Sequence, residues 1–274
     1  MDLTTVEAIL PVRDRAALAG AHRGAADTAL LAGGTWLFSV PQPHLRALVD
    51  LTALGWEPFE VDEQGLRIAA TCPIGALADV PFAPDWAARP LFRQCTRALL
   101  ASFKVRAVAT VGGNVCTALP AGAMTSLTSA LDGVAELWPR EGGVRRLPVA
   151  ELVTGDGRTA LAPGEVLRAV RLPARALRAR TAFRRLSRAR LGRSAALVVG
   201  RREQGGAFAL TVTASTPRPV VLRHAAVPAA RELVAQVEAA VEDGPGWFED
   251  VHGDLDWRRA STLRFAAEVV EELS

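Results

Sequence analysis

The sequence predicts an α+β fold built from three consecutive units. Short apolar runs of strand length alternate with stretches of helical spacing along the whole chain. Two double glycines end apolar runs in the first half, and arginines without a clear apolar face gather near residue 175. We therefore expect a first domain over residues 1–175, with subdomains at about 1–55 and 56–175, and a C-terminal α+β domain over residues 176–274.

The first unit has a β–α–β–loop–β pattern. TVEAIL at residues 5–10 predicts a short strand, and Asp14 is placed to cap a helix over residues 15–22. Apolar runs at residues 28–32 and 47–51 predict two further buried strands. This order favours a small α/β subdomain.

The second unit is richer in hairpins. Strands are expected at residues 59–62, 66–70, 104–111, 134–138, 144–147 and 166–172. Helices are expected at residues 73–78, 85–99 and 124–131. The strand over 104–111 depends on the alternation of Val105, Ala107, Ala109 and Val111 on one face.

The third unit predicts a three-stranded antiparallel sheet followed by helices. Its strands are expected at residues 181–186, 195–202 and 207–214, with Gly205-Gly206 as a turn. Helices are expected at residues 228–241 and 257–273.

Composition excludes several classes of protein. Half of the 274 residues are hydrophobic, which indicates a folded chain. No apolar run approaches the roughly 18–20 residues of a membrane span, and no secretory signal is found, so we expect a cytoplasmic protein without a membrane span. The three cysteines form no C-x-x-C pair, and the four histidines show no metal spacing. A disulfide framework, a zinc site or an iron–sulfur site built by this chain alone is therefore not expected.

The charge is mildly basic and comes from arginine. Net charge is +3, and ten arginines fall between Arg168 and Arg193. They are compatible with a solvated strand face and linker, or with a site for phosphate or an acidic partner. Only Phe183 is interleaved among them, so a nucleic-acid interface is disfavoured.

Two segments share one design, an apolar strand running into a double glycine and a small polar residue. They are Ala32-Gly33-Gly34-Thr35 and Thr110-Val111-Gly112-Gly113-Asn114. Glycine permits positive φ and close approach, so successive backbone N–H groups could turn toward an anion, helped by a helix after the second segment. Neither segment is G-x-G-x-x-G or a P-loop.

These segments, followed by Pro120 and a helix ending in Ala130-Leu131-Asp132, resemble the FAD subunit of the xanthine dehydrogenase and carbon monoxide dehydrogenase family, the molybdenum hydroxylases. Gly164-Glu165-Val166-Leu167 and Ala182-Phe183-Arg184-Arg185 extend the resemblance over nearly the whole chain. It implies a PCMH-type FAD-binding domain in two subdomains, followed by a small C-terminal domain.

The resemblance also implies a set of FAD contacts and no catalytic or metal-binding residue. The contacts are Leu30, Leu31, Ala32, Gly33, Gly34, Thr35, Trp36, Leu37, Leu100, Thr110, Gly112, Gly113, Asn114, Thr117, Leu167 and Arg184. Residues 30–37 would wrap the diphosphate, and residues 110–114 would form a second wall. Leu100 and Leu167 would lie near the flavin or adenine and Arg184 near the isoalloxazine, although core leucines and a surface arginine are the alternative interpretations.

The chain departs from the family pattern at two positions. Trp36 replaces an acidic residue or asparagine, and Ala123 replaces an aspartate that would bind a hydroxyl of FAD. Losing that hydrogen bond should cost about 1–3 kcal/mol of binding if nothing replaces it. The chain has no tyrosine, so a tyrosine stacked on the flavin is excluded.

The implied function is electron transfer within a molybdenum hydroxylase. A large molybdopterin-binding subunit and a small subunit with two [2Fe–2S] clusters would be the partners, and two such heterotrimers could pair. FAD would pass the electrons to an external acceptor. The alternatives are a stand-alone flavin oxidoreductase and a scaffold subunit that has weakened or lost FAD binding.

Overall fold

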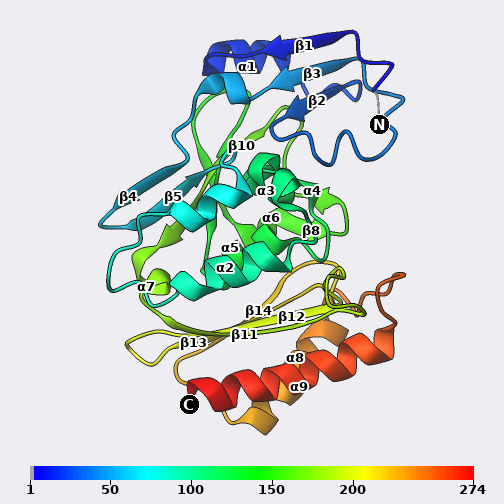
Figure 1. The fold of residues 1–274 in the computed structure, drawn as a ribbon. Helices are drawn as coiled ribbons and strands as arrows, with labels where there is room; N and C mark the ends of the chain where they lie inside the picture. Colours follow the sequence, from blue (N-terminus) through cyan, green and yellow to red (C-terminus); the bar gives the residue numbers. More distant parts are fainter. Residues whose placement is uncertain (1–2) are drawn as a thin grey trace.

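The computed structural model describes residues 3–274, which form three sheet-based units stacked along one direction (Figure 1). The N-terminal unit is a parallel sheet in the order β1–β3–β2. Its strands are β1 (Ala8–Pro11), β2 (Thr28–Leu31) and β3 (Ala47–Asp50). Helix α1 (Arg15–Ala21) joins β1 to β2, and Asp14 caps it by accepting a hydrogen bond from the Ala17 N–H at 2.8 Å. These elements confirm the expected β–α–β order.

The middle unit is a five-stranded antiparallel sheet in the order β4–β5–β10–β6–β7. The strands are β4 (Phe59–Asp62), β5 (Gly65–Ala69), β6 (Val134–Trp138), β7 (Arg145–Pro148) and β10 (Val166–Pro173). Both expected hairpins are confirmed, since β4 pairs with β5 and β6 with β7. The central strand β10 is almost wholly buried although it carries Arg168 and Arg171, as expected of a strand with neighbours on both sides.

Helices of the middle unit pack its core against the sheet. They are α2 (Arg89–Ala98), α3 (Phe103–Val108), α4 (Val111–Thr117), α5 (Ala123–Ala130) and the short α6 (Val149–Leu152). The helices expected at 85–99 and 124–131 are α2 and α5, and residues 73–78 form a 3-10 helix (Ile74–Asp79). A small hairpin of β8 (Val153–Gly155) and β9 (Arg158–Thr159) was not expected.

The strand predicted over residues 104–111 is wrong. The segment forms α3, a kink, and the first residue of α4. Ser102 caps α3 by accepting from the Val105 N–H at 3.3 Å, and Thr110 caps α4. No residue of α3 is buried, whereas Ala109 and Val111, which follow it, are buried in the core of the middle unit. The alternating residues therefore do not share one face, and the pattern carries no strand information here.

The C-terminal unit has four antiparallel strands rather than three, in the order β11–β12–β13–β14. They are β11 (Arg180–Leu186), β12 (Ala196–Arg202), β13 (Phe208–Thr213) and β14 (Val220–His224), followed by α8 (Ala230–Glu242) and α9 (Leu255–Leu273). Strand β14 escaped prediction because Pro217 and Pro219 precede it and suggest a turn. Figure 1 shows α8 and α9 on the outer face of this sheet.

The inner face of the C-terminal sheet packs on the middle unit. Leu197 and Val199 join the core of the middle unit, whereas Ala196 and Val198 face α8 and α9. The segment 173–180, expected to be a junction, begins with α7 (Ala174–Leu177), whose leucine is fully buried. The chain therefore enters the C-terminal unit through an anchored helix.

Candidate functional site

The three units surround a pocket of about 650 Å³, within the range of small-molecule and cofactor sites of roughly 300–1,000 Å³. It lies where the chain leaves β2, beside α3 and the first turn of α4, with β10 behind it. Fourteen of the sixteen residues expected to contact FAD line this pocket. They are Leu30, Ala32, Gly33, Gly34, Thr35, Trp36, Leu37, Leu100, Thr110, Gly112, Gly113, Asn114, Thr117 and Leu167.

The loop after β2 lines the pocket and carries unpaired backbone donors. Among the described residues 3–274, no backbone N–H of residues 32–37 donates a hydrogen bond. The Thr35 hydroxyl likewise has no partner within that range. Six successive N–H groups without acceptors are unusual in a folded chain, and such a run suits an anion.

Glycine is required in this loop by close packing. A Cβ on Gly33 would overlap the carbonyl oxygen of Val108 at the end of α3, which is backbone and cannot rotate away. Gly34 has φ +68°, a conformation that strains other residues. The double glycine therefore lets the loop pass against α3 while its N–H groups stay free.

The second double glycine plays a different part. It lies in the first turn of α4, and its N–H groups already have acceptors. The Gly112 N–H donates to the Ala70 carbonyl at 2.9 Å, and the Gly113 N–H donates to the Thr110 hydroxyl at 3.1 Å. A Cβ on Gly112 would lie 2.5 Å from the Ala70 Cβ. The expectation that both loops turn free amides toward an anion is wrong for this segment, which supplies a tightly packed wall.

Asn114 is the polar side chain that this wall offers. Its Oδ1 accepts a hydrogen bond from the Met124 N–H at 2.8 Å, which ties α4 to the start of α5. The Asn114 amide N–H donors have no acceptor within residues 3–274. The nearby Thr117 hydroxyl donates to the Gly113 carbonyl at 2.7 Å and keeps its lone pairs for another donor.

Apolar side chains supply the remaining surface. Trp36 and Leu100 are 41% and 57% exposed, whereas Leu167 is almost buried in β10. An exposed tryptophan and leucine at a pocket mouth suit a flat aromatic ligand more than water. Ala123 is fully buried in α5 and is absent from the pocket lining, where its neighbours Ala121 and Gly122 lie.

Arg184 and Leu31 do not line the pocket. The Arg184 guanidinium in β11 is held by the α9 carboxylates of Glu268 and Glu272, at 2.8 and 2.7 Å. Hydrogen bonding to Glu268 raises the pKa of Arg184, and the positive charge of Arg184 is neutralised by these two carboxylates. The structure therefore places Arg184 on the outer face of the C-terminal sheet, where it fastens α9.

Arg193 is the positively charged side chain that lines the pocket. It lies in the loop between β11 and β12, is half-buried, and has no hydrogen bond or ion pair within residues 3–274. Sequence reasoning did not single it out, because it is one of ten arginines between residues 168 and 193 and nothing in the sequence distinguishes it.

The pocket contains no acid, base or nucleophile poised for bond chemistry. Cys116 is its one titratable group besides Arg193, and burial raises the pKa of that thiol to about 12. Within residues 3–274, no cluster of His, Cys, Asp or Glu is arranged to hold a metal ion. In the same range, no helix is long and apolar enough to cross a membrane.

Comparisons with known proteins agree with this geometry. A family described as the FAD binding domain in molybdopterin dehydrogenase matches residues 6–175. The carbon monoxide dehydrogenase medium chain of Afipia carboxidovorans is 31% identical over 154 residues, which are 54% of this chain and 51% of that protein. The match thus spans about half the length of this curated relative.

Solved structures show the same fold over the full length. Reconstituted CO dehydrogenase from Oligotropha carboxidovorans has a TM-score of 0.81 at 22% identity, covering 100% of this chain and 99% of that one. Quinoline 2-oxidoreductase from Pseudomonas putida 86 has a TM-score of 0.78 at 20% identity, covering 100% and 98%.

Proposed function

Since this chain belongs to the family of FAD-binding domains in molybdopterin dehydrogenases, we propose that its large pocket holds FAD and that the protein is the flavin subunit of a molybdenum hydroxylase. The observation that carries the proposal is the run of six unpaired N–H groups at residues 32–37, which lines the pocket. A diphosphate is the part of FAD that needs such donors.

The residues present fit this cofactor. Residues 32–37 would hold the diphosphate through the backbone, and Asn114 and Thr35 would add side-chain donors. Arg193 would balance part of the negative charge. Trp36, Leu100 and Leu167 would cover aromatic ring surface. The backbone N–H groups at the start of α4 would not bind the diphosphate, because they already donate hydrogen bonds within the protein.

FAD would supply the ability to take up electrons one at a time and pass them on in pairs. The protein's own task is then to grip the cofactor, keep water from part of it and leave an edge accessible. We propose, as partners, a large molybdopterin-binding subunit and a small subunit with two [2Fe–2S] clusters, in a heterotrimer that can pair with a second one. Support comes from two proteins of similar fold. One is named a Cu,Mo-CO dehydrogenase, and the other a carbon monoxide dehydrogenase that lacks the Mo-pyranopterin moiety of its molybdenum cofactor.

We also propose that the chain divides near residue 175 into an FAD-binding domain and a C-terminal domain. The family match ends at residue 175, and the hydrophobic cores of the middle and C-terminal sheets are largely separate. Arg193 would bring the C-terminal domain to the cofactor.

The test is FAD binding by the purified full chain. We expect flavin absorption bands, near-stoichiometric FAD released by heat, and binding of FAD at least about tenfold tighter than FMN, since FMN lacks the diphosphate; tenfold corresponds to about 1.4 kcal/mol. A colourless protein that quenches no flavin fluorescence when FAD is added would overturn the assignment and favour a scaffold subunit. Equal affinity for FAD and FMN would overturn the role given to residues 32–37.

A further inference from the structure

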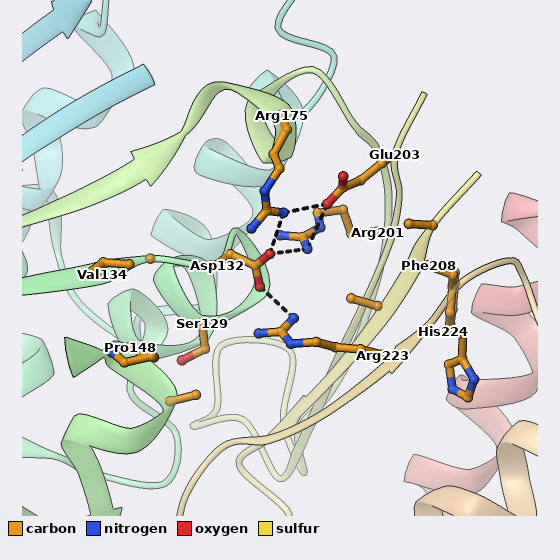
Figure 2. A pocket seen from close by; sticks show the side chains of 14 residues that line it. Ser129, Asp132, Val134, Pro148, Arg175, Arg201, Glu203, Phe208, Arg223 and His224 are labelled. Atoms are coloured by element: carbon orange, nitrogen blue, oxygen red, sulfur yellow. Dashed lines mark hydrogen bonds and ion pairs between the residues drawn. The ribbon is translucent and has the colours of Figure 1, made fainter. Parts of the chain in front are cut away.

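A second cavity, of about 430 Å³, lies between the end of α5 and the C-terminal sheet and shares no lining residue with the FAD pocket (Figure 2). Charged side chains from four segments converge on it. They are Asp132 after α5, Arg175 in α7, Arg201 and Glu203 at the end of β12, and Arg223 in β14.

Asp132 is the centre of this cluster. Its Oδ2 lies 2.7 Å from Arg175 and 2.5 Å from Arg201, and its Oδ1 lies 2.7 Å from Arg223. Burial alone would raise the pKa of Asp132, but the three arginines outweigh it and hold that pKa below its usual value. The carboxylate is therefore ionised, and the residue tolerates φ +52° to reach this position.

The charges in the cavity do not balance. Three arginines carry three positive charges, and Asp132 with Glu203 carries two negative ones, which leaves one positive charge without a partner. Glu203 is shared, with its Oε1 at 2.6 Å from Arg175 and 3.1 Å from Arg201. The Arg175 and Arg223 side chains are 54% and 55% exposed, so the excess positive charge faces the open side of the cavity, where it attracts an anion.

Four buried polar atoms of residues on the cavity wall also lack hydrogen-bond partners among the described residues. They are Ser129 Oγ, Asp132 Oδ1, Arg201 Nε and His224 Nε2, of which Ser129 Oγ and Arg201 Nε can donate to an anion. The two side chains belong to residues only 3% exposed, so bulk water does not satisfy them. Leaving such an atom unsatisfied costs about 1–3 kcal/mol, which favours a bound ligand in the cavity.

Apolar residues supply part of the wall. Val134 and Pro148 line the cavity from the middle sheet, together with three alanines. Phe208 and His224 line it as well, but the Phe208 side chain packs in the core between the C-terminal sheet and α8 and α9. The volume exceeds that needed for a lone inorganic ion and suits a small organic molecule.

We propose that this cavity binds a small organic monoanion, a carboxylate on an apolar body, with the carboxylate against Arg223 and Arg201. One negative charge matches the single excess positive charge. The two terminal nitrogens of Arg201 are held by the Ala130 carbonyl and by Asp132, so Arg201 offers its free Nε. Arg223 offers the guanidinium nitrogens that do not pair with Asp132. The apolar body lies on Val134 and Pro148. This inference stands independently of the proposed FAD site, since the two cavities share no residue.

The probe is benzoate, with neutral benzamide as its isostere and inorganic phosphate as the competing anion. Binding is measured on the full chain by calorimetry and by the shift in Tm, at constant ionic strength and with excess FAD. We expect a saturable Tm rise with benzoate and none with benzamide.

The variant is Arg223→Gln, whose side chain is 55% exposed, so the substitution leaves the core intact. Arg264→Gln is its control, because Arg264 is 62% exposed and also loses one ion pair, on α9. Benzoate affinity should fall at least tenfold in Arg223→Gln and stay unchanged in Arg264→Gln. A response equal in both variants, equal binding of benzamide, or tighter binding of phosphate than of benzoate overturns the proposal.

Discussion

The side-chain oxygen of Asn114 lies 2.8 Å from the backbone nitrogen of Met124 and accepts its hydrogen bond. Helix α5 has no side chain of its own that caps its N-terminus, since Gly122 occupies the cap position. Asn114 therefore does the work of a capping residue from a neighbouring helix, while its amide group faces the proposed cofactor pocket. Two tasks meet in one side chain, and substitutions can separate them.

Asn114→Ala should lower the free energy of unfolding by about 1 kcal/mol, the usual cost of a lost cap, and should also weaken FAD binding. Asn114→Asp keeps the acceptor, so we expect stability within about 0.5 kcal/mol of the parent, because Asn and Asp cap equally well. Its carboxylate would repel the diphosphate and should weaken FAD binding at least about tenfold. Urea unfolding and fluorescence quenching of FAD measure the two effects. If Asn114→Asp bound FAD as the parent does, Asn114 would have no place in the site.

Gly33→Ala should be among the most damaging single-methyl changes in the chain. The added Cβ would overlap the Val108 carbonyl, so the loop or α3 must shift, at a cost of about 1–3 kcal/mol. FAD affinity should fall with it, because residues 32–37 move. Gly20→Ala in α1 is the matched control: nothing lies within 4 Å of its new methyl group, and alanine should stabilise the helix by about 0.5–1 kcal/mol. Thermal unfolding of both variants should therefore move in opposite directions.

Local patterns predicted most of the strands and helices because burial and periodicity agree there. The run over residues 166–172 is buried on both sides as β10, and Asp14 caps α1 where its spacing to the apolar residues required. At residues 104–111 the periodicity of the sequence and the burial in the structure do not agree. There the helical caps Ser102 and Thr110 decide the conformation, and the alternating residues divide between the exposed α3 and the buried start of α4.

The candidate site could be predicted from the sequence only where a local motif, such as a double glycine, identifies it. The double glycines in the sequence identify the two segments. They do not reveal that the Gly112 and Gly113 N–H groups already have acceptors, because tertiary packing and helix capping bring Ala70 and Thr110 to them. Arg193 and Arg184 look equivalent in the sequence. Only the fold puts carboxylates of α9 beside Arg184 and leaves Arg193 at the pocket.

Arg193→Gln should weaken FAD binding about tenfold and make that binding less sensitive to salt, because a charge facing the diphosphate is removed. Arg190→Gln is the control, as Arg190 is exposed in the same loop and outside the pocket. The measurement is FAD affinity at low and high salt. Identical affinities and salt slopes for the two variants would remove Arg193 from the site.

Arg184→Gln should lower stability slightly and leave FAD binding unchanged. It breaks two partly exposed ion pairs to α9, which together contribute about 0.5–1 kcal/mol, so the Tm should fall slightly. FAD affinity should not change, because Arg184 lies outside the pocket. A loss of FAD binding with unchanged Tm would restore the role near the isoalloxazine that the family resemblance implies.

Stability should fall as pH rises from 8 to 10, and the cysteines are the cause. Burial raises the pKa of Cys72 to about 12, raises that of Cys116 to about 12, and raises that of Cys95 as well. A thiol whose folded-state pKa exceeds its unfolded value of about 8.5 contributes stability below pH 8.5 and loses it above, at up to about 1.4 kcal/mol per pH unit. The unfolded chain can then release protons that the folded chain must keep.

The amino-acid composition makes the cysteine contribution to the pH dependence of stability measurable. The chain has no tyrosine and Lys104 is its single lysine, so few other groups titrate in that window. Burial lowers the pKa of Arg168 to about 10, which acts in the opposite direction only above that pH, and the scan therefore ends at pH 10. Urea unfolding at intervals from pH 8 to 10 should show a falling free energy of unfolding. Cys72→Ala should flatten the slope whatever its effect at pH 7, and an unchanged slope would show that this thiol ionises equally well in the folded protein.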